Sequence, residues 1–246
     1  MISRIFLITL VGIIGGIFTT LAGGGSMIVI PALIFLGFPP VVASAINRVG
    51  IMFTCFTAIF TFKNKGYYNL NLGLLLGIPA VIGSIIGAEI AVSLPEELFN
   101  QILILVMLFM LGLIFINTII DQVDTTIFLS FKKLLFLSFI FFIIGIYGGF
   151  IQAGVGMIIL VTLSILTGFS IVEINSIKVV IMVLYLIPSL IIYMHRIDIN
   201  WIYTLSLFIG NYTGAYLGTV FSFMADTVLI KIIFSICIIT LIFFII

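Results

Sequence analysis

Uncharged apolar segments follow one another along this chain from one end to the other. They lie near residues 5–22, 26–38, 41–62, 70–93, 97–118, 133–151, 155–168, 172–194, 200–222 and 227–246. A helix needs about 20 residues to cross the hydrocarbon core of a bilayer. Only 7% of the 246 residues are charged, whereas soluble domains carry about 25%. The sequence therefore predicts an all-α, polytopic integral membrane protein, multi-pass in the cell membrane, and we expect a bacterial plasma membrane.

The charged and reactive residues exclude several classes of function. Nine Lys and Arg nearly balance eight Asp and Glu, so the chain has no basic surface for nucleic acid. Cys55 and Cys237 lie in apolar segments without metal-ligand spacing, and we expect neither a metal nor a cofactor. With one histidine and no nucleophile or phosphate-binding motif, the chain is not expected to be an enzyme.

The apolar segments divide into two similar halves. The polar interval IIDQVDTTIFLSFKK separates them, and we assign residues 1–118 to a first repeat, 119–132 to a linker and 133–246 to a second repeat. A shift of about 130 residues places GGGSM of the first half on AGVGM of the second, and one further residue places Asn69 on Asn200. Secondary transporters are commonly built from such duplications, with the substrate site between the repeats. The few loop charges leave open whether the repeats are parallel or inverted.

Each half opens with two short apolar pieces joined at small residues. Together the two pieces have about 34 residues, too many for one straight span and too few for two. We therefore predict two pseudo-symmetric repeats, each with a broken or re-entrant first helix pair. A helix that begins inside the membrane points free N–H groups and its positive dipole end at an anion. The candidate substrate-binding residues at these breaks are Gly24, Gly25, Ser26, Gln152, Gly154 and Gly156.

The glycines have a second interpretation, because small residues also let membrane helices pack closely. We keep this alternative open for the breaks. We prefer it for the pairs at four-residue spacing: Gly12/Gly16, Gly73/Gly77, Gly83/Gly87, Gly145/Gly149 and Gly214/Gly218.

Two cations stand inside apolar segments, where an ionisable group costs about 2.5–3.5 kcal/mol and needs a partner or water. Arg48 follows Asn47 in AINRVG, and Lys178 lies three residues after Asn175 in NSIKVV. We expect the two cations to converge on an anion, with the two asparagines giving direction. The alternative is that both side chains reach out to the membrane interface.

Glu89 follows the Gly83/Gly87 pair near the end of its span. A buried carboxyl group can carry a proton, so Glu89 is a candidate for proton coupling. It could equally reach the interface or pair with a basic residue.

These residues occur in stretches that resemble a known family. MIVIPALIFLGFPPVVASAINR and GYYNLNLGLLLGIPAVIGSIIGAEIA in the first half, with GIYGGFIQAGVGM, NSIKVV and DINWIYTLSLFIGNYTGAYLG in the second, resemble the TauE/SafE family of sulfite and organosulfonate exporters, also called the toluene-sulfonate uptake permease family. The resemblance implies a transporter of sulfite, sulfonates or related small anions. It also implies that the pathway is lined by Gly24, Gly25, Asn47, Arg48, Gly154, Gly156, Asn175 and Lys178. The chain departs from the family pattern at Val155, where a small residue is common, and at Arg48, where Lys is frequent.

The function predicted is a secondary transporter of small anions that works by alternating access at a site between the repeats. The partners expected are a small anionic substrate and the lipid bilayer. An anion channel and a non-transport membrane scaffold are the alternatives. The identity of the anion, the direction of transport, coupling to protons and assembly into a homo-oligomer stay open.

Overall fold

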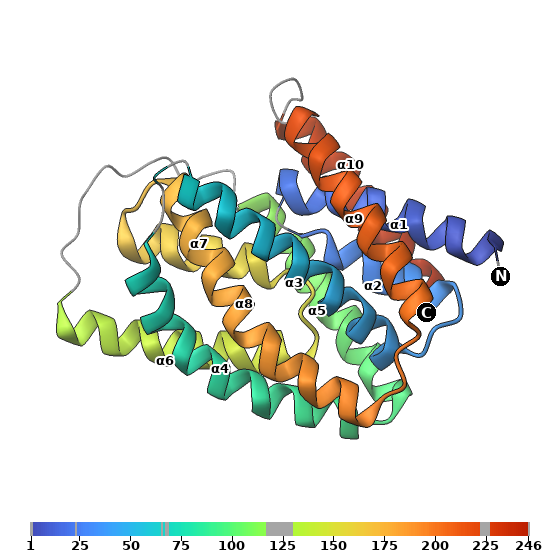
Figure 1. The fold of residues 1–246 in the computed structure, drawn as a ribbon, viewed down its shortest axis with the longest axis horizontal. Coiled ribbons are helices and arrows are strands. Elements are labelled where there is room, and N and C mark those ends of the chain that lie inside the picture. Colours follow the sequence, from blue (N-terminus) through green and yellow to red (C-terminus); the bar gives the residue numbers. More distant parts are fainter. Residues whose placement is uncertain are drawn as a thin grey trace.

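The structure is a computed structural model, and it describes residues 2–22, 24–64, 66, 69–116, 130–221 and 227–245. Within these ranges the regular structure is entirely helical (Figure 1). The helices are α1 (Ile2–Ala22), α2 (Ser26–Phe35), α3 (Pro40–Asn64), α4 (Leu70–Ser93), α5 (Glu96–Ile116), α6 (Phe131–Phe150), α7 (Val155–Thr167), α8 (Ile171–Arg196), α9 (Trp201–Phe221) and α10 (Thr227–Ile245). The predicted all-α class is therefore confirmed. Most of the predicted linker, 119–132, lies outside the described residues.

Five helices of the described chain are long and apolar enough to cross a membrane. They cover Ile2–Thr20, Pro40–Asn64, Leu70–Ser93, Phe131–Phe150 and Ile171–Arg196. In contrast, α2 and α7 have 10 and 13 residues, or about 15 and 20 Å at 1.5 Å per residue. Each is too short to span a hydrocarbon core of about 30 Å on its own. The predicted short second piece of each half is therefore present as a separate helix.

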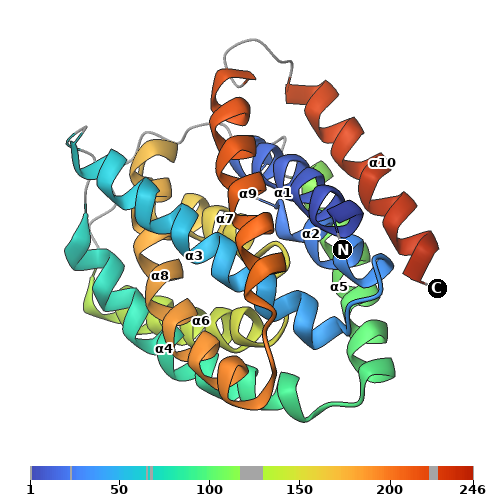
Figure 2. The same cartoon turned by 45° about the vertical axis from the view of Figure 1, so that its right-hand side comes forward.

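Helices α1 and α9 lie side by side, and so do α4 and α6 (Figure 2). The contacts are made by glycine faces. A Cβ atom on Gly16 would lie 2.3 Å from the carbonyl oxygen of Asn211, and one on Gly214 would lie 2.0 Å from that of Ile13. In the other pair, a Cβ on Gly87 would lie 1.9 Å from the carbonyl oxygen of Ile146. The predicted packing role of these small-residue pairs is confirmed, because the backbones approach too closely for any side chain.

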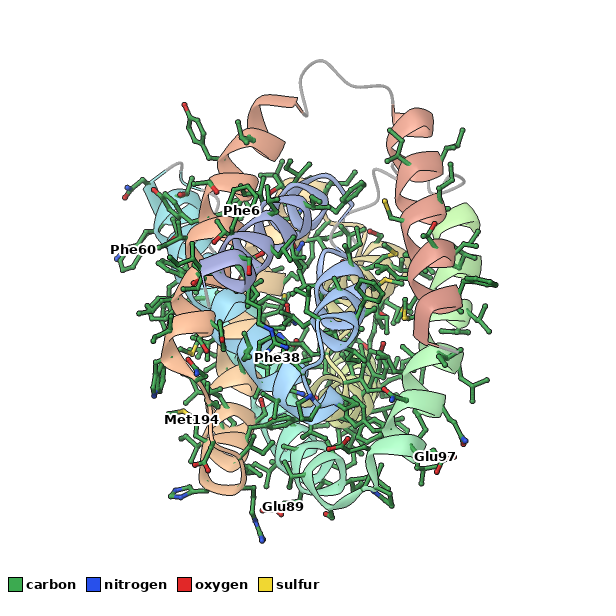
Figure 3. All side chains as sticks on the ribbon, turned by 90° about the vertical axis from the view of Figure 1, so that its right-hand side faces the viewer. Phe6, Phe38, Phe60, Glu89, Glu97 and Met194 are labelled. Atoms are coloured by element: carbon green, nitrogen blue, oxygen red, sulfur yellow. The ribbon has the colours of Figure 1, made fainter. Side chains whose placement is uncertain are left out.

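Helices α3 and α8 pass each other in the centre of the molecule (Figures 1 and 2). They run in opposite directions, as their ends show. Figure 3 places Glu89, Glu97 and Met194 at one end of the molecule and Phe60 toward the other. Because Met194 is near the end of α8 and Phe60 near the end of α3, the two helices finish at opposite ends.

The charged ends and the apolar flanks of the bundle suit a membrane. Large apolar side chains such as Phe6 (63% exposed) and Phe60 (66% exposed) point outward from α1 and α3 (Figure 3). A soluble domain would seldom leave so many such residues uncovered. Polar residues are instead found inside, where Asn47, Arg48 and Gln152 are at most 1% exposed.

Candidate functional site

The first helix pair is interrupted where Gly25 meets the body of α1. A Cβ atom at Gly25 would lie 2.0 Å from the carbonyl oxygen of Gly15 and 2.1 Å from Oγ1 of Thr19. Only glycine allows this approach. The backbone then enters α2 directly, and the Met27 N–H donates to the Gly24 carbonyl at 2.8 Å. Gly23, the first glycine of the triplet, lies outside the described residues.

The second helix pair is interrupted by a turn with two residues in the left-handed region. Gln152 has a φ of 66° and Gly154 a φ of 74°, and Gly154 is the N-cap of α7. Such a conformation is uncommon for a residue with a side chain and costs on the order of 1–3 kcal/mol. The Tyr147 hydroxyl donates to the Ala153 carbonyl, which holds the turn against α6. Glycine and glutamine thus shape a sharp break between α6 and α7.

The two breaks lie against each other. The Ser26 hydroxyl, at the start of α2, donates to the Gln152 carbonyl at 3.4 Å. A Cβ on Gly154 would lie 3.2 Å from the sulfur of Met27. The N-terminal ends of α2 and α7 are therefore neighbours, although 126 residues separate Ser26 from Gln152.

A cavity of about 490 Å³ opens beside the two breaks. Its lining includes five of the ten predicted substrate-binding residues, namely Gly25, Ser26, Gly156, Asn175 and Lys178. The other five do not line it, namely Gly24, Asn47, Arg48, Gln152 and Gly154. The structure thus brings the start of α2, the start of α7 and the polar face of α8 to one space.

Lys178 supplies the charge of this cavity. Its ammonium group donates to Oδ1 of Asn175 at 2.5 Å, and the Asn175 amide donates to the Ile171 carbonyl at 2.9 Å. The i, i+3 spacing places both side chains on one face of α8, as predicted. Among the described residues that line the cavity, Lys178 is the only one with a charged side chain. The cavity therefore presents a positive charge oriented by an amide.

Sequence reasoning missed the hydroxyl groups that line the cavity. Thr54, Thr57 and Thr61 of α3 follow one helix face at intervals of three and four residues, a pattern that the sequence already contained. Each hydroxyl donates to the backbone carbonyl four residues earlier, at 3.0 to 3.1 Å. Four further hydroxyl-bearing residues line the cavity, namely Thr19 and Thr20 of α1 and Tyr212 and Tyr216 of α9, the two tyrosines again four residues apart.

Arg48 binds the C-terminal end of α6 instead of facing the cavity. Its Nη1 donates to the Gly148 carbonyl at 2.9 Å, and its Nη2 donates to those of Gly149 and Phe150 at 2.7 and 3.2 Å. These carbonyls have no partner within the helix and carry the negative end of its dipole. The guanidinium group therefore caps α6 where the chain turns toward α7.

The predicted convergence of the two cations is wrong. Besides the α6 carbonyls, the Arg48 guanidinium contacts Ser189 and Tyr193 of α8, at 3.2 and 3.1 Å. Lys178 lies 11 residues before Ser189, or about 16 Å along the helix at 1.5 Å per residue. The two positive groups therefore occupy different levels of α8, and Arg48 is not exposed at all.

Two predicted amides are buried without partners. Asn47 is not exposed, Gln152 is 1% exposed, and no side-chain nitrogen or oxygen of either has a hydrogen-bond partner among the described residues. An unsatisfied buried polar group costs about 1–3 kcal/mol. The described contacts therefore do not compensate the burial of these two amides.

Glu89 lies at the end of the bundle that Figure 3 shows at the bottom. Its carboxylate is 3.8 Å from the guanidinium of Arg196, and half of its side chain is exposed. Glu89 therefore pairs with a basic residue in the structure, which is one of the two alternatives to proton coupling. Glu89 does not line the cavity.

The fold and the cavity define a multi-pass integral membrane protein with a positively charged space among its helices, which is the architecture of a transport protein. The sequence matches the family described as sulfite exporter TauE/SafE over residues 8–245. The chain belongs to this family, which is a transporter family and not an enzyme family.

Three curated relatives are similar to the chain. A "Probable membrane transporter protein" of Haemophilus influenzae is 28% identical over 209 residues, covering 85% of this chain and 81% of the relative. "Probable membrane transporter protein YdhB" of Bacillus subtilis is 23% identical over 231 residues, 92% of each chain. "Probable membrane transporter protein ORF9" of a Sinorhizobium species is 31% identical over 90 residues, 37% of this chain and 34% of the relative. No solved structure matches the chain.

Proposed function

We propose that the chain is a secondary transporter that moves small anions, sulfite or sulfonates in the first place, across the cell membrane. The observation that carries the proposal is Lys178, a cation that lines an internal cavity of a protein whose family is named for sulfite export. An unneutralised cation among membrane helices is costly. A negatively charged solute would remove that cost, since none of the described residues that line the cavity carries a carboxylate.

The breaks add to the attraction for an anion. Gly25 and Ser26 at the start of α2, and Gly156 at the start of α7, line the same cavity as Lys178. Helix N-termini carry partial positive charge and free N–H groups. Among the described residues, the Gly156 N–H has no backbone acceptor. Discontinuous helices that point their N-termini at an anionic group are a common transporter device.

Reciprocal packing supports the proposal of two inverted repeats. The first helix of each half lies against the fourth helix of the other, as α1 on α9 and α6 on α4. The third helices, α3 and α8, run in opposite directions (Figure 3). Asn69 accepts a hydrogen bond at the start of α4, and Asn200 accepts one before α9. An exchange of the two halves by a twofold axis in the membrane plane would account for all three relations.

Inverted repeats suggest how access alternates. In the second half, Arg48 caps the end of α6, and Ser189 and Tyr193 hold Arg48 in place. In the first half the end of α1, with Thr19 and Thr20, borders the open cavity. We propose that transport exchanges these two arrangements, so that one side is capped while the other is open.

Transport can be tested with the purified chain in proteoliposomes. We expect Lys178→Gln to lower sulfite and methanesulfonate counterflow at least about tenfold, which is a loss of roughly 1.4 kcal/mol of interaction. Lys63→Gln is the matched control, because Lys63 is exposed near the end of α3 and does not line the cavity. Anion flux that needs no exchanged anion on the opposite side of the membrane would indicate an anion channel. Absence of flux in the wild type with every anion would leave the scaffold as the better explanation.

A further inference from the structure

We propose that the cavity selects anions that carry a single negative charge, and that Lys178 sets this selectivity. This inference rests on the proposed transport of anions and specifies which of them are accepted; for sulfite the accepted form is the hydrogensulfite monoanion. It follows from the number of positive charges and free donors in the cavity.

Lys178 is the only charged side chain among the described residues that line the cavity. Arg48, the other cation inside the bundle, has both terminal nitrogens bound to protein acceptors and is fully buried elsewhere. One negative charge is therefore neutralised in the cavity, and a second one is not. An uncompensated buried charge costs several kcal/mol.

The hydroxyls of six lining residues already donate to backbone carbonyls, namely Thr19, Thr20, Ser26, Thr54, Thr57 and Thr61. One N–H of Lys178 goes to Asn175, which leaves two of its three. A single anionic group is served by these two N–H donors together with the helix N-termini. The hydroxyls of Tyr212 and Tyr216 also line the cavity, and as neutral donors they leave a second negative charge without a counter-charge.

Ile51, Phe62, Val179 and Met182 contribute apolar surface to the cavity. Such a surface accommodates a neutral organic group but does not solvate charge. The cavity therefore suits one charged end and one uncharged end better than two charged ends.

The experiment compares two probes of similar chemistry on the full-length chain in nanodiscs. Methanesulfonate carries one charge and methanedisulfonate carries two, and binding is measured by calorimetry at constant pH and ionic strength. We expect the monoanion to bind at least about tenfold more tightly. Lys178→Gln is expected to abolish binding of the monoanion, whereas Lys178→Arg retains it.

A gain-of-charge variant provides the converse test. Met182 lies one helical turn beyond Lys178 and also lines the cavity, so Met182→Lys places a second cation on the same face. We expect it to shift the preference toward the disulfonate by about tenfold or more, and Met182→Gln, the uncharged control, to leave the preference unchanged.

Two results would overturn the inference of monoanion selectivity while leaving the proposed anion transport intact. One is a wild type that binds methanedisulfonate as tightly as methanesulfonate. The other is a Lys65→Gln variant that loses as much affinity for methanesulfonate as Lys178→Gln does. Lys65 lies outside the described residues, and such a loss would mean that it supplies a second positive charge. Failure of the wild type to bind either probe, with no sulfite binding, would overturn the proposed function as well.

Discussion

The guanidinium of Arg48 lies over the ring of Tyr193, with Cζ 4.3 Å from the ring centroid. Its Nη2 also donates to the Tyr193 hydroxyl at 3.1 Å, and that hydroxyl donates to the Phe150 carbonyl at 2.7 Å. Arg48 and Tyr193 therefore bind the end of α6 together. A planar fork that stacks on an aromatic ring while it binds several acceptors is a role that Lys cannot fill.

Replacement of Arg48 is expected to destabilise the protein. Arg48→Met removes the guanidinium donors from the Gly148, Gly149 and Phe150 carbonyls, and the cost is about 2–4 kcal/mol because buried acceptors lose charged partners. Arg48→Lys restores the charge but not the fork, so we expect an intermediate loss. Thermal unfolding of the purified variants in detergent measures both.

Tyr193→Phe is the control for this prediction. It removes the hydroxyl and its two hydrogen bonds but keeps the ring under Arg48. We expect a loss of about 1 kcal/mol. An Arg48→Met protein as stable as the wild type would contradict the capping role.

The sequence was sufficient to predict the helices and their close packing. Long apolar segments mark spans, and pairs such as Gly83/Gly87 face a neighbouring backbone because nothing larger fits. Both signals are local. The polar face formed by Asn175 and Lys178 was also predictable, since it depends on the spacing within one helix.

The role of Arg48 could not be predicted in the same way. Its principal partners are backbone carbonyls 100 to 102 residues away, and a backbone carbonyl has no signature in the sequence. The place of Glu89 likewise depends on Arg196, a residue of another helix. Long-range contacts thus decided which of the intramembrane charges faces the cavity.

The first break depends on the absence of a side chain at Gly25. In Gly25→Ala the new methyl group would clash with the Gly15 carbonyl at 2.0 Å, and backbone atoms cannot move away cheaply. We expect a loss of several kcal/mol or a failure to fold, judged by yield and thermal unfolding.

Gly112→Ala is the matched control for Gly25→Ala. Gly112 lies within α5, and a Cβ there would meet no described atom within 4 Å. Alanine favours helix over glycine by about 1 kcal/mol, so this variant is expected to be as stable as the wild type or slightly more so. Equal tolerance of both substitutions would count against the close approach at the first break.

Glu89→Gln is expected to have little effect. The ion pair with Arg196 is 3.8 Å long and both side chains are at least half exposed, so its contribution to stability is below about 1 kcal/mol. Counterflow of sulfite should also change little, because Glu89 does not line the cavity. A large loss of proton-dependent transport in this variant, with normal stability, would return Glu89 to the coupling role.

The open and closed sides of the bundle can be distinguished by cysteine modification. Thr57 lines the cavity and is exposed, whereas Ser44 lies in α3 one turn before Arg48 and is fully buried. With Cys55 and Cys237 replaced by serine, Thr57→Cys should react with a small charged thiol reagent at least about tenfold faster than Ser44→Cys, since reactivity follows access. Methanesulfonate should slow the reaction at position 57, because it would occupy the same cavity. If anions instead left position 57 unaffected while they competed in counterflow, the substrate would bind elsewhere.

Adding Arg48→Met to the Ser44→Cys variant tests the cap directly. Loss of the Arg48 hydrogen bonds to α6 should raise the reactivity of position 44, and unchanged protection there would mean that Arg48 does not hold this side closed.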